Sequence, residues 1–249
     1  MFRRNKENKA KLEHKLYLAR EAPEPIFDLS ECDLRNVPQG IYSLCRVFLK
    51  EVLRLDRNCL SSLSGGGQLK DLLQLKVLDL HDNAFVYLPD DIQLLKNLRE
   101  LYVNDNQLKK LPETICNLSN LVILNVANNS LKALPVNIGN LKHLKLLSVN
   151  ANKHLKHLPK SICKARRLTV VELDAGNFIY PPAEVAGAGA EAIMRYICNG
   201  NYFVATSPPF LTLFADIGVE YVGPHQAELL DDSDVKDYED SRDQVDAFE

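Results

Sequence analysis

The amino-acid sequence predicts an α/β solenoid, in which short coils stack on one another and each coil contributes one strand to a parallel sheet. Three observations predict this fold: a leucine pattern with a period of 23 residues, a helix expected before it and a helix expected after it. One coil is too small to bury its own apolar side chains, so neighbouring coils must cover them and the end coils need caps. The chain of 249 residues is long enough for such a stack.

The repeated pattern is clearest in the middle of the chain, where three segments align without gaps. Each has the form Leu-x-x-Leu-x-(Leu/Val)-x-x-Asn-x-(Leu/Phe)-x-x-Leu-Pro. One copy that follows contains an extra residue, and weaker copies stand at both ends, so about seven repeats extend over residues 26–182. In chain order, the asparagine position is occupied by Cys32, Asn58, Asn83, Asn106, Asn129, Asn152 and Gly176.

Each copy is expected to form one coil. The leucines around each variable residue alternate into the core from a short strand. The asparagine amide can satisfy backbone groups of neighbouring coils, and the proline begins a short helical or 3₁₀ return segment. This is the pattern of leucine-rich repeats, and it predicts an α/β leucine-rich-repeat solenoid, or horseshoe, with its parallel sheet on the concave side.

Both ends of the stack are predicted to be capped by helices. Residues 1–25 form the first cap, with a helix from residue 6 to about residue 21 that places Leu12, Leu16 and Ala19 on one face. Its other face is rich in lysine, so binding to a membrane surface is the alternative interpretation. Residues 183–200 form the second cap, which is predicted to be one closing helix. Its expected core contacts are Val185, Ile193, Tyr196 and Ile197.

Two further segments do not follow the repeat. Gly65-Gly66-Gly67 lacks the Lys-Ser/Thr of a phosphate-binding loop, so a flexible insertion is expected. Residues 201–249 are irregular and then acidic, with ten acids against two bases from Glu228 onward. Such a composition predicts a disordered tail, and binding to a basic partner is the alternative.

The composition excludes several classes of function. The net charge is −3 and tryptophan is absent, so a nucleic-acid-binding surface is not expected. No run of about 18 apolar residues is present, so stable membrane insertion is not expected. The six cysteines form no Cys-x-x-Cys pair and no disulfide-rich cap, which favours a reducing, cytoplasmic location.

No catalytic motif is present, so this chain is not expected to be an enzyme, and neither a cofactor nor a metal site is predicted. There is no Gly-x-Ser-x-Gly elbow, no His-Glu-x-x-His and no kinase signature. His154 and His157 have the spacing of metal ligands, but no further ligand is near them in sequence.

A protein partner is expected on the concave face. Side chains between the core positions of each strand point to that face and stack into rows. One row is mostly apolar and lies beside a tyrosine and several acids, a composition that suits a binding surface, although the apolar side chains could simply shield the sheet. The candidate partner-binding residues are Arg54, Asp56, Val77, Asp79, His81, Glu100, Tyr102, Asn104, Ile123, Asn125, Leu146, Ser148, Val170 and Glu172.

Four segments carry a more specific resemblance: Leu16–Ala22, Asp28–Leu34, Val77–Asn83 and Tyr180–Gly189. They resemble the N-terminal region of the leucine-rich-repeat and sterile-alpha-motif-containing E3 ubiquitin-protein ligase family. The resemblance extends over roughly residues 3 to 210. The repeats alone are generic, whereas the leading helix together with the Tyr-Pro-Pro segment is more specific.

In that family the repeats recognise cargo and a C-terminal RING domain supplies the ligase activity. The paired Cys/His zinc ligands of a RING do not occur in these 249 residues. The resemblance therefore implies the recognition part of a ubiquitin-ligase-type protein, expected as a monomer, and present as a fragment, a short isoform or a stand-alone relative. The alternative is a stand-alone signalling scaffold of the Ras-suppressor or phosphatase-regulator type.

Overall fold

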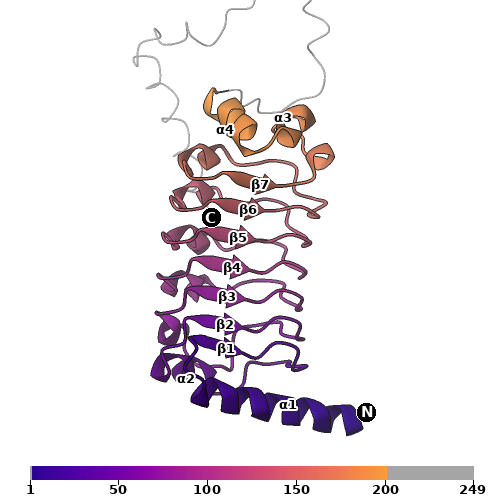
Figure 1. Ribbon diagram of the computed structural model, residues 1–249. Helices are drawn as coiled ribbons and strands as arrows, with labels where there is room; N and C mark the ends of the chain where they lie inside the picture. The colour runs from indigo at the N-terminus through magenta and orange to yellow at the C-terminus, as the bar shows by residue number, and fades with distance from the viewer. Residues whose placement is uncertain (1, 201–249) are drawn as a thin grey trace, which may run out of the picture. The chain divides into compact units, whose positions relative to one another are not determined.

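The computed structural model describes residues 2–200, and the predicted acidic tail lies outside the described residues. Seven parallel strands form one sheet whose order follows the chain from β1 to β7. Figure 1 shows the coils stacked in this order, with helix α1 (Phe2–Glu21) at one end and helices α3 (Ala183–Gly187) and α4 (Ala190–Cys198) at the other. The leucine-rich-repeat solenoid predicted from the sequence is confirmed.

Each strand is three residues long, and its middle residue points into the core. Leu53, Leu78 and Leu101 are paired in register across neighbouring strands and are completely buried. Side chains before and after them point to the outside of the sheet. The strands are β1 (Ile26–Asp28), β2 (Val52–Arg54), β3 (Val77–Asp79), β4 (Glu100–Tyr102), β5 (Ile123–Asn125), β6 (Leu146–Ser148) and β7 (Val170–Glu172).

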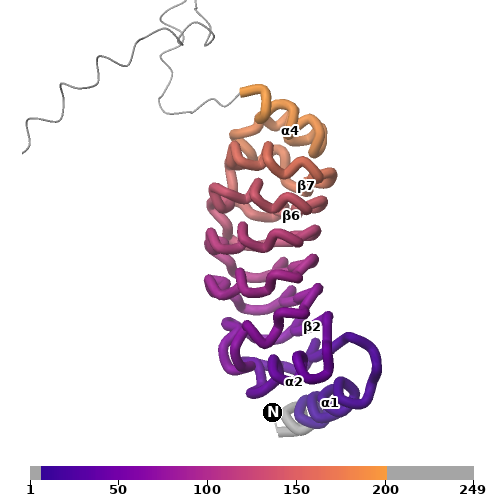
Figure 2. The backbone as a smooth tube through the Cα atoms, turned by 90° about the vertical axis from the view of Figure 1, so that its left-hand side faces the viewer, coloured from indigo at the N-terminus to yellow at the C-terminus, as the bar shows by residue number. Residues whose placement is uncertain are grey.

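The chain returns behind the sheet through short helices, which are mostly 3₁₀ helices. Figure 2 shows the stacked coils from the side. Pro89, Pro112 and Pro159 have extended backbones directly before three of them, since proline both fixes φ and needs no helical N–H partner. The return helices are α2 (Ile41–Val47), η1 (Leu69–Leu72), η2 (Asp90–Leu94), η3 (Glu113–Asn117), η4 (Ile138–Asn140) and η5 (Lys160–Lys164). After β7 comes η6 (Ala175–Asn177).

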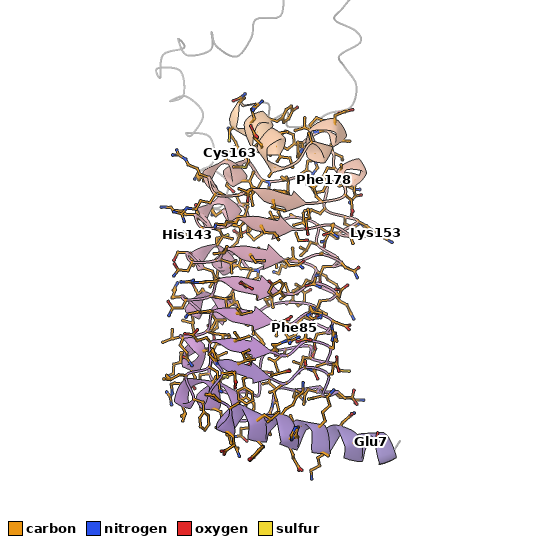
Figure 3. The ribbon with its side chains drawn as sticks, viewed as in Figure 1. Glu7, Phe85, His143, Lys153, Cys163 and Phe178 are labelled. Carbon is orange, nitrogen blue, oxygen red and sulfur yellow. The ribbon has the colours of Figure 1, made fainter. Side chains whose placement is uncertain are left out.

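Figure 3 separates the two edges of a coil: His143 lies on the side of the return helices, and Lys153 lies at the opposite edge, where the chain leaves the sheet. Between these edges the core is continuous and apolar. Phe85 occupies a position that is leucine in most copies, and it is completely buried. The larger ring is therefore accommodated inside the stack rather than at its surface.

Asparagine side chains tie each coil to the coil before it. The amide nitrogen of Asn129 donates to the carbonyl oxygens of Val103, Val126 and Ala127 at 2.9, 3.1 and 3.0 Å. Its amide oxygen accepts the Leu108 N–H at 2.8 Å. One side chain thus satisfies four backbone groups where the strands end. The same arrangement is made by Asn58, Asn83, Asn106, Asn129 and Asn152.

The last coil keeps a modified form of this bond. Gly176 stands where the pattern has asparagine, but the next residue, Asn177, donates its amide to the Asn152 carbonyl oxygen at 3.0 Å. The Asn177 amide oxygen accepts from the Lys156 ammonium group. The asparagine function is therefore partly retained in this coil, because the neighbouring residue supplies a side-chain amide.

The three-glycine segment packs against Tyr42 instead of standing away from the coils as a flexible insertion. Tyr42 is completely buried, and its hydroxyl donates to the Leu63 carbonyl oxygen at 2.7 Å. A Cβ atom at Gly66 would lie 2.7 Å from the Tyr42 ring and from the Val37 side chain. The glycine is needed because the chain passes too close to these groups for any side chain.

The N-terminal cap is fastened to the first coil by Lys15. Helix α1 begins earlier than the predicted residue 6, and Ala19 is buried while Leu12 and Leu16 pack against the core. The Lys15 ammonium group donates to Asp28 Oδ1 at 2.9 Å, to the Ser30 carbonyl oxygen at 2.7 Å and to the Ser30 hydroxyl at 2.9 Å. This charged contact holds the helix across the end of the stack.

The C-terminal cap is two helices instead of the one continuous helix predicted. The break falls between α3 and α4, where Gly189 adopts φ of 91°, a conformation that favours glycine. Ile193 and Ile197 of α4 are completely buried, and Val185 of α3 packs partly buried against the core. Within residues 2–200, no helix combines the length and the apolar composition needed to cross a membrane.

Replacing Asn129 with alanine should destabilise the whole stack. The change leaves three carbonyl oxygens and one N–H without their partner in a buried position, which costs about 3 kcal/mol in the free energy of unfolding. Urea denaturation followed by circular dichroism measures this loss. Ser130→Ala, at the neighbouring exposed position, is the matched control and should change stability little. A loss for Asn129→Ala no larger than for the control would contradict the structural role of the amide.

Replacing Lys15 with methionine should weaken the N-terminal cap in a pH-dependent way. Burial raises the pKa of the Asp28 carboxyl, but the hydrogen bonds from Ser30 and the contact with Lys15 together lower it by more, so the net shift is downward. Because its pKa is lower in the folded than in the unfolded state, the Asp28 carboxylate stabilises the fold at pH values above its unfolded pKa of about 3.9. This stabilisation is lost as the pH falls toward the folded-state pKa. The difference in unfolding free energy between wild type and variant should therefore be larger near pH 7 than near pH 3.

The matched control for that measurement is Lys9→Met, on the same helix. Lys9 is largely exposed, and its ammonium group lies 3.9 Å from the Glu13 carboxylate. Exposed pairs of this kind contribute little to stability. Hydrogen exchange of the α1 amides in both variants locates the effect. Equal protection of α1 in wild type and Lys15→Met would show that the lysine does not hold the cap.

Candidate protein-binding face

The outer side chains of the seven strands form the sheet face, which is the side predicted to be concave. Residues at equivalent strand positions pair in register, so they stand in rows: Val77 beside Glu100, and Asp79 beside Tyr102. A third row, which contains Asp56, His81 and Asn104, lies two residues beyond the strands. Backbone hydrogen bonds continue the pairing of the coils there: the N–H after Asp56 donates to the His81 carbonyl oxygen, and the N–H after His81 donates to the Asn104 carbonyl oxygen. The structure thus places the fourteen candidate partner-binding residues in three neighbouring rows, and twelve of them are at least partly exposed.

The first row is mostly apolar. Ile123 is paired with Leu146, which in turn is paired with Val170. Ile123 and Leu146 are partly exposed, and Val170 at the end of the sheet is 41% exposed. Glu100 interrupts the row, and Val77 continues it on the other side. The row presents apolar surface that a partner could cover.

Tyr102 lies on the same strand as Glu100 and is held by a hydrogen bond to it. Its hydroxyl donates to Glu100 Oε2 at 2.9 Å. Burial and this hydrogen bond to a carboxylate raise the pKa of Tyr102 to about 12. The ring is therefore fixed in one orientation on the sheet face, with its hydroxyl protonated at physiological pH, which suits an aromatic anchor for a protein contact.

Two of the predicted binding residues lie below the surface. Ser148 is 1% exposed, and its hydroxyl is hydrogen-bonded to Asn150 and to Glu172 Oε2, at 2.8 and 2.6 Å. Asp56 is completely buried. The residues equivalent to Ser148 in the other coils are at least partly exposed, and those equivalent to Asp56 range from buried Ser30 and Ala127 to exposed Asp174, so the sequence position alone did not distinguish the two. Ser148 therefore supports Glu172 from beneath instead of offering its own hydroxyl to a partner.

Asp56, Asp79 and His81 form a compact polar cluster between the ends of β2 and β3. His81 Nδ1 lies 2.7 Å from Asp79 Oδ1, and His81 Nε2 lies 3.9 Å from Asp56 Oδ2. Asp56 Oδ1 accepts the Arg54 Nε–H at 3.3 Å, whereas Asp56 Oδ2 is buried without a hydrogen-bond partner. These residues were expected on one face from their positions in the sequence, but not as a cluster.

The cluster is the one place in residues 2–200 where three or more potential metal ligands converge, with ligand atoms within 4.8 Å of one another. His154 and His157, the pair with ligand-like spacing, are both exposed at the edge of the sixth coil, after β6. A sequence signal for the cluster did exist, because Asp56 and His81 occupy the same position in adjacent repeats.

Comparison with known proteins agrees with this architecture. The family model described as "Leucine Rich Repeat" matches residues 97–118. The mouse (Mus musculus) E3 ubiquitin-protein ligase LRSAM1 is 41% identical over 96 residues, which are 36% of this chain and 13% of that protein. The volume-regulated anion channel subunit LRRC8E of Xenopus laevis is 34% identical over 73 residues, which are 29% of this chain and 9% of that protein.

The fold also agrees with a solved structure. The functional domain of InlJ from Listeria monocytogenes superposes with a TM-score of 0.51 at 21% identity, covering 60% of this chain and 30% of that one. A leucine-rich-repeat protein of Leptospira interrogans is 26% identical with a TM-score of 0.44, over 64% of this chain and 52% of that one. The described chain is therefore a leucine-rich-repeat protein-interaction module, and part of it is homologous to LRSAM1.

The raised pKa of Tyr102 gives a direct test of its contact with Glu100. At about pH 11 the hydroxyl should still be largely protonated, so wild type and Tyr102→Phe should show the same tyrosinate absorbance. In a Glu100→Gln background the negative charge is lost and the pKa should fall, so removing Tyr102 should now reduce the absorbance. A difference between wild type and Tyr102→Phe at that pH would show that the hydroxyl ionises normally.

Proposed function

We propose that this chain is the partner-recognition part of a ubiquitin-ligase-type protein and that it binds its protein partner on the sheet face. The observation that supports the first half is the 41% identity to a segment of LRSAM1, a ligase of which the aligned segment is 13%. Leucine-rich repeats stack into an extended surface that suits protein binding. The ligase activity itself is part of the proposal and lies outside the aligned segment.

The sheet face supports the second half of the proposal because it combines anchoring and steering groups. The apolar row from Ile123 to Val170 can be desolvated by a partner, and Tyr102 supplies a rigid aromatic group beside it. Acidic side chains flank both: Asp79 and Glu100 on one side and Glu172 on the other. A partner with an apolar strip bordered by lysine or arginine fits this arrangement.

A reducing, cytoplasmic location belongs to the same proposal. No disulfide bond joins the six cysteines, all of which lie in the part of the chain that the structure describes. Burial raises the pKa of the Cys45 thiol to about 12 and that of Cys116 to about 11, so these two are thiols rather than reactive thiolates. Free cysteines that fill the core as small apolar groups are typical of proteins kept in reducing compartments. We also propose that the chain is a monomer when it meets its partner.

Site-specific photo-crosslinking tests the binding face. A photo-reactive phenylalanine derivative placed at Asn125, which is on the sheet face, should crosslink to a protein partner in cells. The matched control is the same derivative at Lys142, an exposed position behind the sheet in the same coil, which should not crosslink to that partner. Combining Glu100→Lys with Tyr102→Ala should abolish the Asn125 crosslink. Equal crosslinking from both positions would contradict binding on the sheet face.

The ligase part of the proposal needs a second readout. Partners captured through Asn125 should carry ubiquitin, and that ubiquitin should decrease when Glu100→Lys and Tyr102→Ala remove binding. A partner that is captured through the sheet face but never ubiquitinated would contradict a ligase-linked role. It would favour instead the stand-alone scaffold of the Ras-suppressor or phosphatase-regulator type.

A further inference from the structure

We propose that Asp56, Asp79 and His81 form a binding site for a divalent transition-metal cation of the zinc class at the edge of the sheet face. Asp56 lies two residues beyond β2, and His81 lies two residues beyond β3, so the two side chains are neighbours in one row. Asp79, the last residue of β3, contacts the histidine from the same coil. This site is independent of the proposed function, because it rests on geometry within the chain alone.

The tautomer of His81 follows from its contact with Asp79. An ionised carboxylate only accepts hydrogen bonds, so the 2.7 Å contact places a proton on His81 Nδ1. The Asp79 Oδ1 atom also accepts the His81 backbone N–H at 3.1 Å, which fixes the carboxylate against the histidine. In the neutral imidazole, Nε2 is then the unprotonated nitrogen and presents its lone pair.

That lone pair faces another acceptor. His81 Nε2 lies 3.9 Å from Asp56 Oδ2, and Asp56 is completely buried with this oxygen unpartnered. A buried carboxylate oxygen without a hydrogen bond is costly, and two acceptors that face one another repel. A cation between the two atoms removes both penalties, since each atom would then contribute a ligand bond.

A proton on Nε2 would satisfy the arrangement less well. Imidazolium would be attracted to Asp56, but 3.9 Å is too long for a hydrogen bond, so Oδ2 would stay unpaired. A metal ion between His81 Nε2 and Asp56 Oδ2 requires a smaller change in their separation than a direct hydrogen bond does. Zinc bonds of about 2.1 Å to nitrogen and oxygen in tetrahedral geometry hold the ligand atoms about 3.4 Å apart. A closure of about half an ångström therefore completes the contact.

The charges and the surroundings also favour a dication. Asp56 and Asp79 contribute two negative charges, and Arg54, which contacts Asp56 Oδ1, contributes one positive charge. Arg57 also interacts with Asp56, but its own charge is paired with Glu31 at 2.7 Å. Asp79 has the position of the carboxylate that orients a metal-bound histidine through its other ring nitrogen. His81 also lines a groove with Asp82 and Asp105, and its side chain is partly exposed, so the imidazole itself is open to solvent. Imidazole and carboxylate ligands together suit zinc and related divalent ions.

Calorimetric titration of the full 249-residue chain with Zn²⁺ tests the site, using untagged protein in buffer free of chelators. One ion should bind per chain. Asp56→Asn and His81→Gln should each lower the affinity by at least about tenfold, and Asp79→Asn by about 10- to 100-fold through the orientation of the histidine. His154→Gln, at an exposed histidine outside the cluster, is the matched control and should leave the affinity unchanged.

Imidazole ¹⁵N NMR gives a readout that does not depend on affinity. Without metal, His81 should show the tautomer protonated at Nδ1, and Zn²⁺ should shift the Nε2 resonance while leaving Nδ1 protonated. Circular dichroism of each variant establishes that it is folded. Absence of Zn²⁺ binding by folded wild type, equal affinity in His81→Gln, or an imidazolium at neutral pH that ignores Zn²⁺ would each overturn the proposal.

Discussion

The side-chain amide of the repeated asparagine is the interaction on which the rest of the structure depends. Three-residue strands expose unpaired backbone groups wherever the chain turns out of the sheet, and burial makes each of them costly. Asn58, Asn83, Asn106, Asn129 and Asn152 satisfy these groups and, in doing so, link one coil to the next. The amides therefore fix the register in which all other contacts between coils are made.

That register turns single residues into surfaces. Because each coil repeats the last with its strand directly beside it, one side chain per coil becomes a row across the sheet. The apolar row, the Tyr102–Glu100 pair and the Asp56–His81 contact all result from this stacking. A repeat protein can therefore change its binding surface one residue per coil, while the buried leucines and asparagines that hold the stack remain the same.

The two proposed properties use neighbouring parts of the same face and share Asp79. Partner binding is proposed across the apolar row and Tyr102, whereas the cation is proposed where Asp56 and His81 meet beyond β2 and β3. Their common cause is that charged side chains near the ends of the strands are partly covered by the neighbouring coils. A covered charge must find a partner within the protein or take one from solution, and Asp56 Oδ2 has no hydrogen-bond partner within the described residues.

The sequence by itself determined the solenoid, the number of coils and the identity of the rows, because a fixed period with leucine, asparagine and proline at set positions specifies local backbone geometry. Only the tertiary structure decided what each row position does. Asp56 is buried while His81 beside it in the row is partly exposed, and Ser148 is buried while Asn125 beside it is partly exposed. Lys15 reaches Asp28 across the end coil, and the closing segment breaks at Gly189. These outcomes depend on side-chain directions and burial between coils, which no local pattern encodes.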